Sequence, residues 1–259
     1  MRSSIWSALL CSALASSASA QSLSQRVTSA DGSVQVIYPS RPTACGDGET
    51  FIGNVFGRSA YYSDNNSTFY GRGSWSTRPC IHGPARVVAT VISGEVSRLR
   101  PYVGPPPASD NMRTLNASAA EAAGWLNDVI DRGSSKVASE AMLPLVLADG
   151  VDPWPMLLRV ARSDSKSTAI RRSALLWLSN GVNEKLGIDD EGNDTDEDEV
   201  RKQVVFALSQ RPRSESVPEL IDLARTSKYP AARRSAIFWL GQTGDTRAAD
   251  VYAELLKSK

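Results

Sequence analysis

The first half of the chain alternates apolar and polar side chains with the period of β-strands. Val34, Val36 and Tyr38 follow this alternation, and residues 85–103 carry two apolar runs on either side of a Ser-Gly pair. Successive side chains of a strand point to opposite faces, and a Ser-Gly pair between two runs is typical of a turn. The pattern therefore predicts a β-rich segment over residues 27–103.

The pattern changes after a proline-rich stretch. Three consecutive prolines in residues 104–115 fix the backbone and remove hydrogen-bond donors, which indicates a stiff linker between two parts of the chain. Beyond it, Ser118 and Glu121 have the spacing of a helix capping box, and an apolar stripe of helical period ends at Gly133. We therefore expect residues 116–259 to be helical.

The strongest signal in this helical part is an internal repeat. Three segments align without gaps, and a fourth, degenerate copy lies in a predicted helix over residues 135–148 that contains Pro144. The copies begin at residues 137, 170, 200 and 232. Between them, residues 154–162 align with residues 217–225, which predicts a partner helix in each unit. The repeat thus consists of pairs of helices.

Paired helices of this kind need neighbours, because a helix pair with an apolar seam on each member cannot bury both seams alone. We therefore expect about four pairs to stack into an α-α solenoid over residues 116–259. Two departures stand out: residues 181–199 lack a clear partner helix, and Ala207 occupies the position of Trp177 and Trp239.

The first twenty residues have the pattern of a secretory signal peptide. Arg2 precedes a short apolar run over residues 5–14, and Ala18-Ser19-Ala20 is the small-residue pattern that precedes cleavage. The run is too short to span a membrane, so we expect an exported chain, periplasmic or secreted, with no membrane insertion after cleavage. Lipidation of Cys11 is disfavoured by the leucine before it.

Charge and cysteine content narrow the possibilities further. The 259 residues contain 29 Lys and Arg against 28 Asp and Glu, a balance that argues against a nucleic-acid-binding protein. Two cysteines, Cys45 and Cys80, remain after removal of the signal peptide, and in an exported protein they are expected to form a disulfide. A redox role would need a Cys-x-x-Cys motif, which the chain lacks.

The repeats resemble the HEAT-repeat family in its short form, similar to repeats of the phycobilisome-lyase type. The whole chain resembles exported bacterial HEAT-repeat proteins through its three repeat copies, the motif at residues 45–48 and the segment that follows Cys80. The resemblance implies a mostly α protein, in which a superhelical solenoid for protein–protein contact follows a small β-rich segment. It implies no catalytic residues and no cofactor.

A pair of basic residues recurs at the start of each clear repeat. Stacking would align these pairs as a basic ladder that could bind an acidic protein partner. The alternative is that they bind carboxylates and carbonyl groups within the solenoid. The ladder consists of Arg171, Arg172, Arg201, Lys202, Arg233 and Arg234.

The acidic run Asp189–Glu199 is rich in the oxygen ligands that Ca²⁺ prefers. It does not fit the twelve-residue EF-hand pattern, because the central glycine and the final glutamate are missing. A solvated loop whose last acids stabilise the next helix explains it more simply. We therefore predict no metal site.

Asp47 and the lone histidine, His82, are the remaining candidates for chemistry. Asp47 lies between two glycines, which is first of all a turn pattern, and His82 lacks the second ligand or acidic partner that a zinc site or a triad needs.

Three functions follow from these observations. The first is a non-catalytic scaffold that binds a protein of the cell envelope or secreted space through the solenoid. The second is an enzyme or ligand-handling protein that uses the β-rich segment around Asp47 and His82. The third is a structural envelope component that associates with itself.

Overall fold

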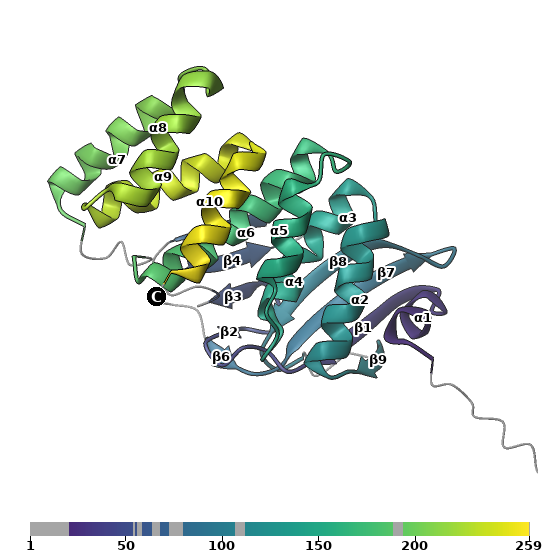
Figure 1. The fold of residues 1–259 in the computed structure, drawn as a ribbon. Helices are drawn as coiled ribbons and strands as arrows, with labels where there is room; N and C mark the ends of the chain where they lie inside the picture. The colour runs from purple at the N-terminus through teal and green to yellow at the C-terminus, as the bar shows by residue number, and fades with distance from the viewer. Residues whose placement is uncertain are drawn as a thin grey trace, which may run out of the picture.

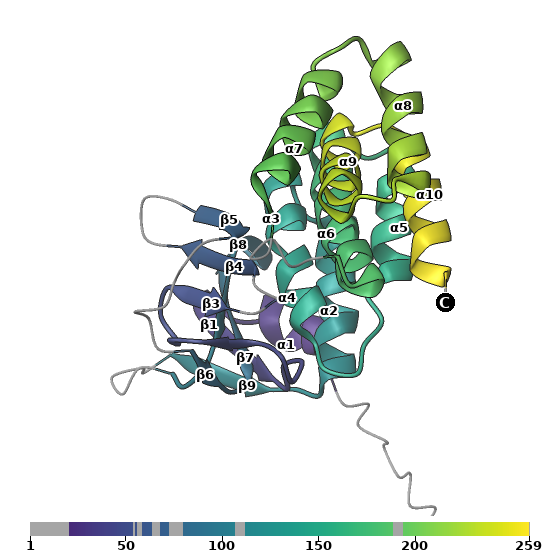
Figure 2. The same ribbon diagram turned by 90° about the vertical axis from the view of Figure 1, so that its left-hand side faces the viewer.

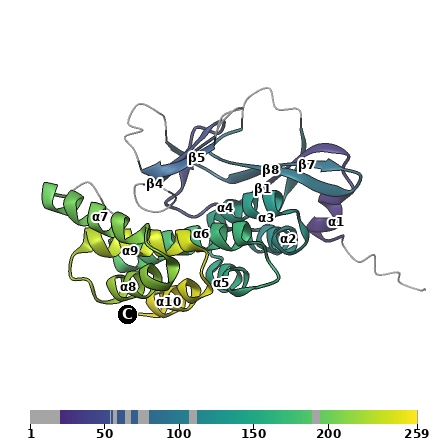
Figure 3. The same cartoon turned by 90° about the horizontal axis from the view of Figure 1, so that it is seen from above.

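The computed structural model describes residues 21–53, 55, 59–63, 68–72, 80–106, 112–188 and 194–258. The predicted signal peptide lies outside these residues. Strands form one layer of the molecule and helices the other, and further helices continue beyond the sheets (Figures 1 and 3). Among the described residues, none of the helices has the length and apolar character needed to cross a membrane.

A four-stranded sheet in the order β8-β7-β1-β9 lies at the centre of the N-terminal half. The predicted β7–β8 hairpin is present, and its turn at Ser93 and Gly94 has positive φ at both positions, as a tight hairpin turn requires. The strands are β1 (Gly32–Tyr38), β7 (Ala85–Ile92), β8 (Glu95–Val103) and β9 (Arg113–Asn116).

Strand β9 starts inside the range predicted as a linker. It pairs in parallel with β1, from Val34 opposite Arg113 to Ile37 opposite Asn116. The proline-rich stretch therefore returns the chain to the same sheet, because the open edge of β1 offers backbone groups that need partners.

A second sheet, in the order β5-β4-β3-β2-β6, carries the predicted disulfide. Cys45 and Cys80 are bonded, with 5.0 Å between their Cα atoms, which confirms the pairing. The strands are β2 (Cys45–Gly46), β3 (Phe51–Gly53), β4 (Ser59–Ser63), β5 (Thr68–Arg72) and β6 (Ile81–His82).

Four helices pack around the first sheet. Helix α2 contacts β1, α3 contacts β8, and α4 contacts β7. The Tyr38 hydroxyl of β1 donates a hydrogen bond of 2.8 Å to the Pro144 carbonyl of α4. The helices are α1 (Leu23–Thr28), α2 (Ala119–Arg132), α3 (Ser135–Glu140) and α4 (Met142–Leu147).

Two expectations for these helices are tested directly. The capping box of Ser118 and Glu121 is present at the start of α2. The single helix predicted over residues 135–148 is instead divided at Ala141 into α3 and α4. Pro144 explains the division, because it has no N–H to donate to the carbonyl group of Glu140. The degenerate repeat copy thus serves to cover the sheet.

Six helices form the C-terminal stack. They lie in two layers, and the pair α7 and α8 forms the end furthest from the first sheet (Figures 1 and 2). The helices are α5 (Trp154–Arg162), α6 (Thr168–Leu186), α7 (Asp196–Ser209), α8 (Arg213–Thr226), α9 (Pro230–Thr243) and α10 (Thr246–Lys257).

The order of helices in the stack differs from their order in the chain. Helix α9 lies between α6 and α7, and α10 contacts both α5 and α8, so α9 and α10 are inserted between the two preceding units (Figure 1). Ion pairs hold α10 on both sides, from Arg162 of α5 to Asp250 at 2.9 Å and from Arg225 of α8 to Glu254 at 2.7 Å. The helices therefore stack, but not in the order of a regular solenoid, in which each pair packs on the next pair along the chain.

The physical reason lies beside α6. This helix has no partner immediately after it in the chain, as the departure in residues 181–199 indicated, and α10 packs against α6 instead. The buried apolar residues form one continuous core from the first sheet into the stack. The linker near residue 104 therefore does not divide the core into two.

Candidate functional site

The basic ladder lies on α6, α9 and α7, in that spatial order. On α6, Arg171 forms an ion pair with Asp164 at 3.1 Å, and Arg172 donates a hydrogen bond to Gln242 of α9 at 3.4 Å. These two side chains therefore have partners within the stack.

The other ladder residues are also engaged. Arg201 pairs with Glu197 and Asp198 at 2.8 Å each. Arg233 of α9 donates a hydrogen bond of 2.8 Å to the carbonyl oxygen of Ala224, in the last turn of α8. Both contacts agree with the structural alternative for the ladder, and its role in binding a partner stays a prediction.

Arg234 differs from the other ladder residues in its burial, because only 4% of its side chain is exposed. It forms an ion pair with Asp194, which also binds Lys202 at 3.2 Å, and it donates a hydrogen bond of 2.9 Å to the carbonyl oxygen of Ile188. Both ends of the connection between α6 and α7 are thus bound to α9. Arg234 fixes the crossover of the stack and is not available to a partner at the surface.

An exposed cluster of aromatic rings lies on α7 and α9. Phe206 of α7 is 41% exposed and Phe238 of α9 is 39% exposed. Each ring centroid lies 5.1 Å from that of Trp239, which is half-buried between them. We call Phe206, Phe238 and Trp239 the aromatic patch. Large aromatic side chains left at a surface are typical of binding sites.

The aromatic patch was missed at the level of sequence, although a signal for it exists. Phe206 and Phe238 occupy the same position of the repeat as Leu176. An apolar residue that recurs beside the buried seam indicates a second, unburied row. The exposed row was not recognised because the buried seam beside it is also apolar. Hydrophobic periodicity therefore does not distinguish the exposed row from the buried one.

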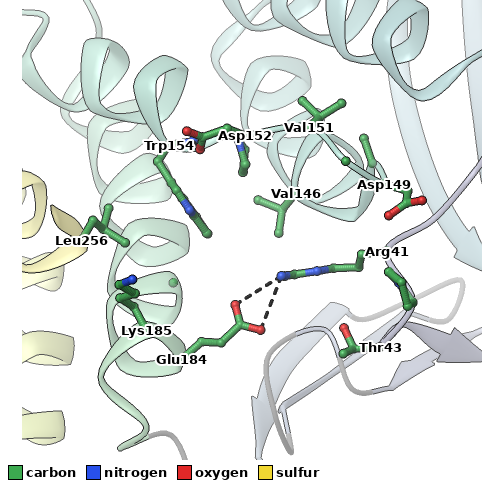
Figure 4. A pocket seen from close by; sticks show the side chains of 15 residues that line it. Arg41, Thr43, Val146, Asp149, Val151, Asp152, Trp154, Glu184, Lys185 and Leu256 are labelled. Atoms are coloured by element: carbon green, nitrogen blue, oxygen red, sulfur yellow. Dashed lines mark hydrogen bonds and ion pairs between the residues drawn. The ribbon is translucent and has the colours of Figure 1, made fainter. Parts of the chain in front are cut away.

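A cleft with a volume of about 740 Å³ lies where the two halves meet (Figure 4). Arg41, from the connection after β1, points across it to Glu184 of α6, at 3.4 and 3.2 Å from the two carboxylate oxygens. Arg41 also donates a hydrogen bond of 3.1 Å to the Val55 carbonyl. This pair joins the sheet half to the stack.

Trp154 forms the opposite wall of the cleft (Figure 4). Its ring lies against Gly181 of α6 so closely that a β-carbon at this position would overlap it. The exposed carboxylates of Asp149 and Asp152 and the exposed Lys185 complete a polar rim. With charged groups at its rim, the cleft suits a polar side chain or a small polar molecule.

Asp47 proves to be the centre of a turn. Its Oδ1 accepts hydrogen bonds from the backbone N–H groups of Glu49, Thr50 and Phe51 at 2.8–2.9 Å, and its Oδ2 accepts one from the Thr50 hydroxyl. Burial alone would raise the pKa of the Asp47 carboxyl, but these hydrogen bonds outweigh it and hold the pKa below its ordinary value. The carboxylate is thus committed to the turn.

His82 lies at the edge of the second sheet. Its Nδ1 is 3.0 Å from the carbonyl oxygen of Ala44, and its residue is exposed. It pairs in register with Cys45, two positions from Asp47, and no contact between the Asp47 and His82 side chains is present. The structure does not assemble the two residues into a catalytic pair.

The acidic run lies partly outside the described residues, which resume at Asp194. Thr195 and Asp198 form a capping box, and four acidic residues occupy the first turn of α7. Within the part of the chain that the structure describes, no group of three or more His, Cys, Asp or Glu residues could hold a metal ion. The prediction that the acidic run Asp189–Glu199 holds no metal stays a prediction for residues 189–193, which lie outside the described residues.

Comparison with known proteins identifies the C-terminal helices. Residues 193–259 match the family of HEAT repeats, a range that contains α7 to α10. This part of the chain is therefore similar to HEAT repeats. No curated protein and no solved structure matches it.

Proposed function

We propose that the protein is a non-catalytic scaffold that binds another protein through the aromatic patch of its HEAT repeats. The observation that carries this proposal is the exposure of two phenylalanine rings, Phe206 and Phe238, on helices that match this family. HEAT repeats are generally protein-interaction scaffolds.

The geometry of the patch supports a role in binding. Both phenylalanine rings rest on Trp239, so little side-chain entropy is lost when a partner covers them. Aromatic side chains are also enriched at the centres of protein interfaces relative to the rest of the protein surface.

We further propose that the protein acts in the cell envelope or outside the cell. The Cys45–Cys80 disulfide supports this location, because such bonds persist in oxidising compartments. Sequencing the N-terminus of the natural protein tests the export step. A chain that begins at Gln21 supports it, and one that begins at Met1 contradicts it.

The binding role is tested by capture and reconstitution. A tagged full-length chain is used to isolate a partner from envelope extract, and the purified partner is then titrated with the wild type and with Phe206→Ser/Phe238→Ser. We expect the Kd to rise at least about tenfold, or about 1.4 kcal/mol, in the double variant.

The matched control is Ile92→Ser, which alters an even more exposed apolar side chain at the end of β7, in the sheet half. It should leave the Kd unchanged. An unchanged Kd for the double variant would remove the patch from the binding surface. A variant with glutamine at the five exposed or half-buried ladder residues, all but Arg234, tests whether the ladder adds charge attraction.

A further inference from the structure

The outer face of α7 is apolar and uncovered. Val200 and Val204 are 62% and 63% exposed, and Gln203 and Ala207 on the same side of the helix are exposed as well. We call these four residues the outer face of α7. At about 100° per residue, the centre of this face lies about 110° around the helix from the direction of Phe206, and Gln203 is the member nearest to that ring. This face is therefore distinct from the aromatic patch.

The repeat shows what this face is built for. In the gapless alignment, Val200 and Val204 correspond to Ile170 and Ala174 of α6 and to Ala232 and Ala236 of α9. All four counterparts are at most 6% exposed. The same motif positions are thus buried by a neighbouring helix in the middle of the stack and bare at its end.

The position of α7 explains the difference. Helix α6 has α3 and α4 on one side and α9 on the other, and α9 lies between α6 and α7. Helix α7 contacts only α9 and α8 in the described stack. Terminal repeats usually carry a polar outer face that ends the stack. Helix α7 instead presents a face made for a further layer.

The opposite end of the stack is closed, because α2, α3 and α4 lie there and the first sheet packs behind them. Among the described residues, the stack therefore has one open end, at α7. Two copies that join through the same end form a closed pair, whereas a head-to-tail contact would need a second open end.

From these observations we propose that the outer face of α7 binds the same face of a second copy, with the two α7 helices antiparallel across a two-fold axis. This inference is independent of the aromatic patch and goes beyond the proposed scaffold function.

Charge selects the antiparallel arrangement. The first turn of α7 contains four acidic residues, Asp196 to Glu199. A parallel pairing would place these two clusters side by side, and their repulsion would oppose it. An antiparallel pairing places each cluster near Arg211 and Arg213 of the other copy, although Arg211 also binds Glu215 and Glu219 of its own chain.

The contact has a defined register. With the axis beside Gln203 and Val204, each Gln203 faces its counterpart, and each Val200 faces Ala207 of the second copy. Small apolar side chains at these positions allow two helices to approach closely. One helix face buries less surface than a standard interface, so we expect a dimer of moderate affinity.

Sedimentation of the full chain over a range of concentrations tests the dimer. We expect a monomer–dimer equilibrium in the wild type and a monomer at every concentration for Val200→Glu/Val204→Glu. The variant should keep its helical circular dichroism, because both side chains are exposed. Phe206→Ser/Phe238→Ser should dimerise as the wild type does, which separates this proposal from the scaffold function. A wild type that stays monomeric throughout would overturn the proposal.

Cysteine cross-linking tests the register in a Cys11→Ser background. Gln203→Cys should form a disulfide-linked dimer on mild oxidation, whereas Lys136→Cys, exposed on α3, should not. A mixture of Val200→Cys and Ala207→Cys chains should cross-link, and Val200→Cys alone should not. Cross-linking of Val200→Cys with itself would indicate a parallel pair and contradict the arrangement. A dimer that Gln203→Cys fails to cross-link would place the contact elsewhere.

Discussion

The sheet half and the helical stack hold together by different means. Around the second sheet, the backbones of neighbouring segments are in close contact. A β-carbon on Gly46 would overlap the carbonyl groups of Phe51 and Val103. Gly48 has a φ of +80° and donates a hydrogen bond of 2.9 Å to the Val103 carbonyl. In the stack, by contrast, apolar side chains at repeating positions fill the space between helices.

Because of this difference, we expect the sheet half to tolerate substitution less well than the helical stack. Glycine is the residue that fits both the positive φ and the close approach in the motif at residues 45–48. Repeat positions accept several apolar residues, as Ile170, Ala232 and Val200 at one position show. The sheet half is thus defined by individual residues and the stack by a pattern, apart from the crossover that Arg234 fixes.

The largest effect is expected in the sheet half, on removal of the disulfide. Cys45→Ala/Cys80→Ala should lower the free energy of unfolding by about 4 kcal/mol, because the bond closes a loop of 35 residues. Urea unfolding of the variant and of the reduced wild type measures this loss. Equal stability with and without the bond would show that the glycine contacts alone hold this half.

The next effect tests whether the stack also depends on single residues. Arg234→Gln should cost about 3 kcal/mol, since it leaves Asp194 buried with Lys202 as its remaining partner. Chemical denaturation measures the change. The double variant Asp194→Asn/Arg234→Gln is the control and should lose less, because it leaves no buried charge without its partner. A loss under about 1 kcal/mol in the single variant would contradict the role of Arg234.

Two identical substitutions sharpen the contrast within the stack. Val182→Ala, at a fully buried position of α6, should cost about 2 kcal/mol through lost burial and the cavity it leaves. Val204→Ala on the outer face of α7 should change stability by less than about 0.5 kcal/mol in dilute solution. Thermal unfolding of both variants at low concentration compares them. Similar losses would mean that α7 is covered within a single chain.

A smaller loss than that of Val182→Ala is expected at the turn around Asp47, and it depends on pH. The pKa of this carboxyl is lowered in the folded protein, so its contribution is complete above the unfolded pKa and is lost as the pH falls through the folded pKa. Asp47→Asn should lower stability at pH 7 by about 1 kcal/mol and reduce its dependence on pH in the acidic range. Denaturation at pH 7 and at pH values below about 4 measures both. An unchanged acid dependence would contradict this role.

Much of the fold was predictable because local patterns determine it. The β7–β8 hairpin, the capping box of α2 and the repeated helices all follow from residues close in sequence. Strand β9 was not predictable in this way, since its partner β1 lies far away in sequence and the pairing depends on an open strand edge. The split of α3 and α4 could have been predicted from Pro144.

The candidate sites were harder to predict than the fold. The sequence indicated that Asp47 belongs to a turn, because an aspartate between glycines caps its own backbone. It did not show that Arg234 is buried, since a pair of basic residues looks the same whether it faces solvent or a distant carboxylate. The cleft between Arg41 and Trp154 brings together residues from separate elements, and no local pattern marks it.

Hydrophobic period, capping residues and cysteine content are local signals, and they were enough to predict a β-rich part with a disulfide and a repeated set of helices. The order in which the helices stack became clear only from the three-dimensional structure. Each copy of the motif can cover the seam of any other, so the repeat does not specify its own neighbours. The insertion of α9 and α10 beside α6, the anchoring of the crossover by Arg234 and the exposure of α7 depend on contacts between residues distant in sequence.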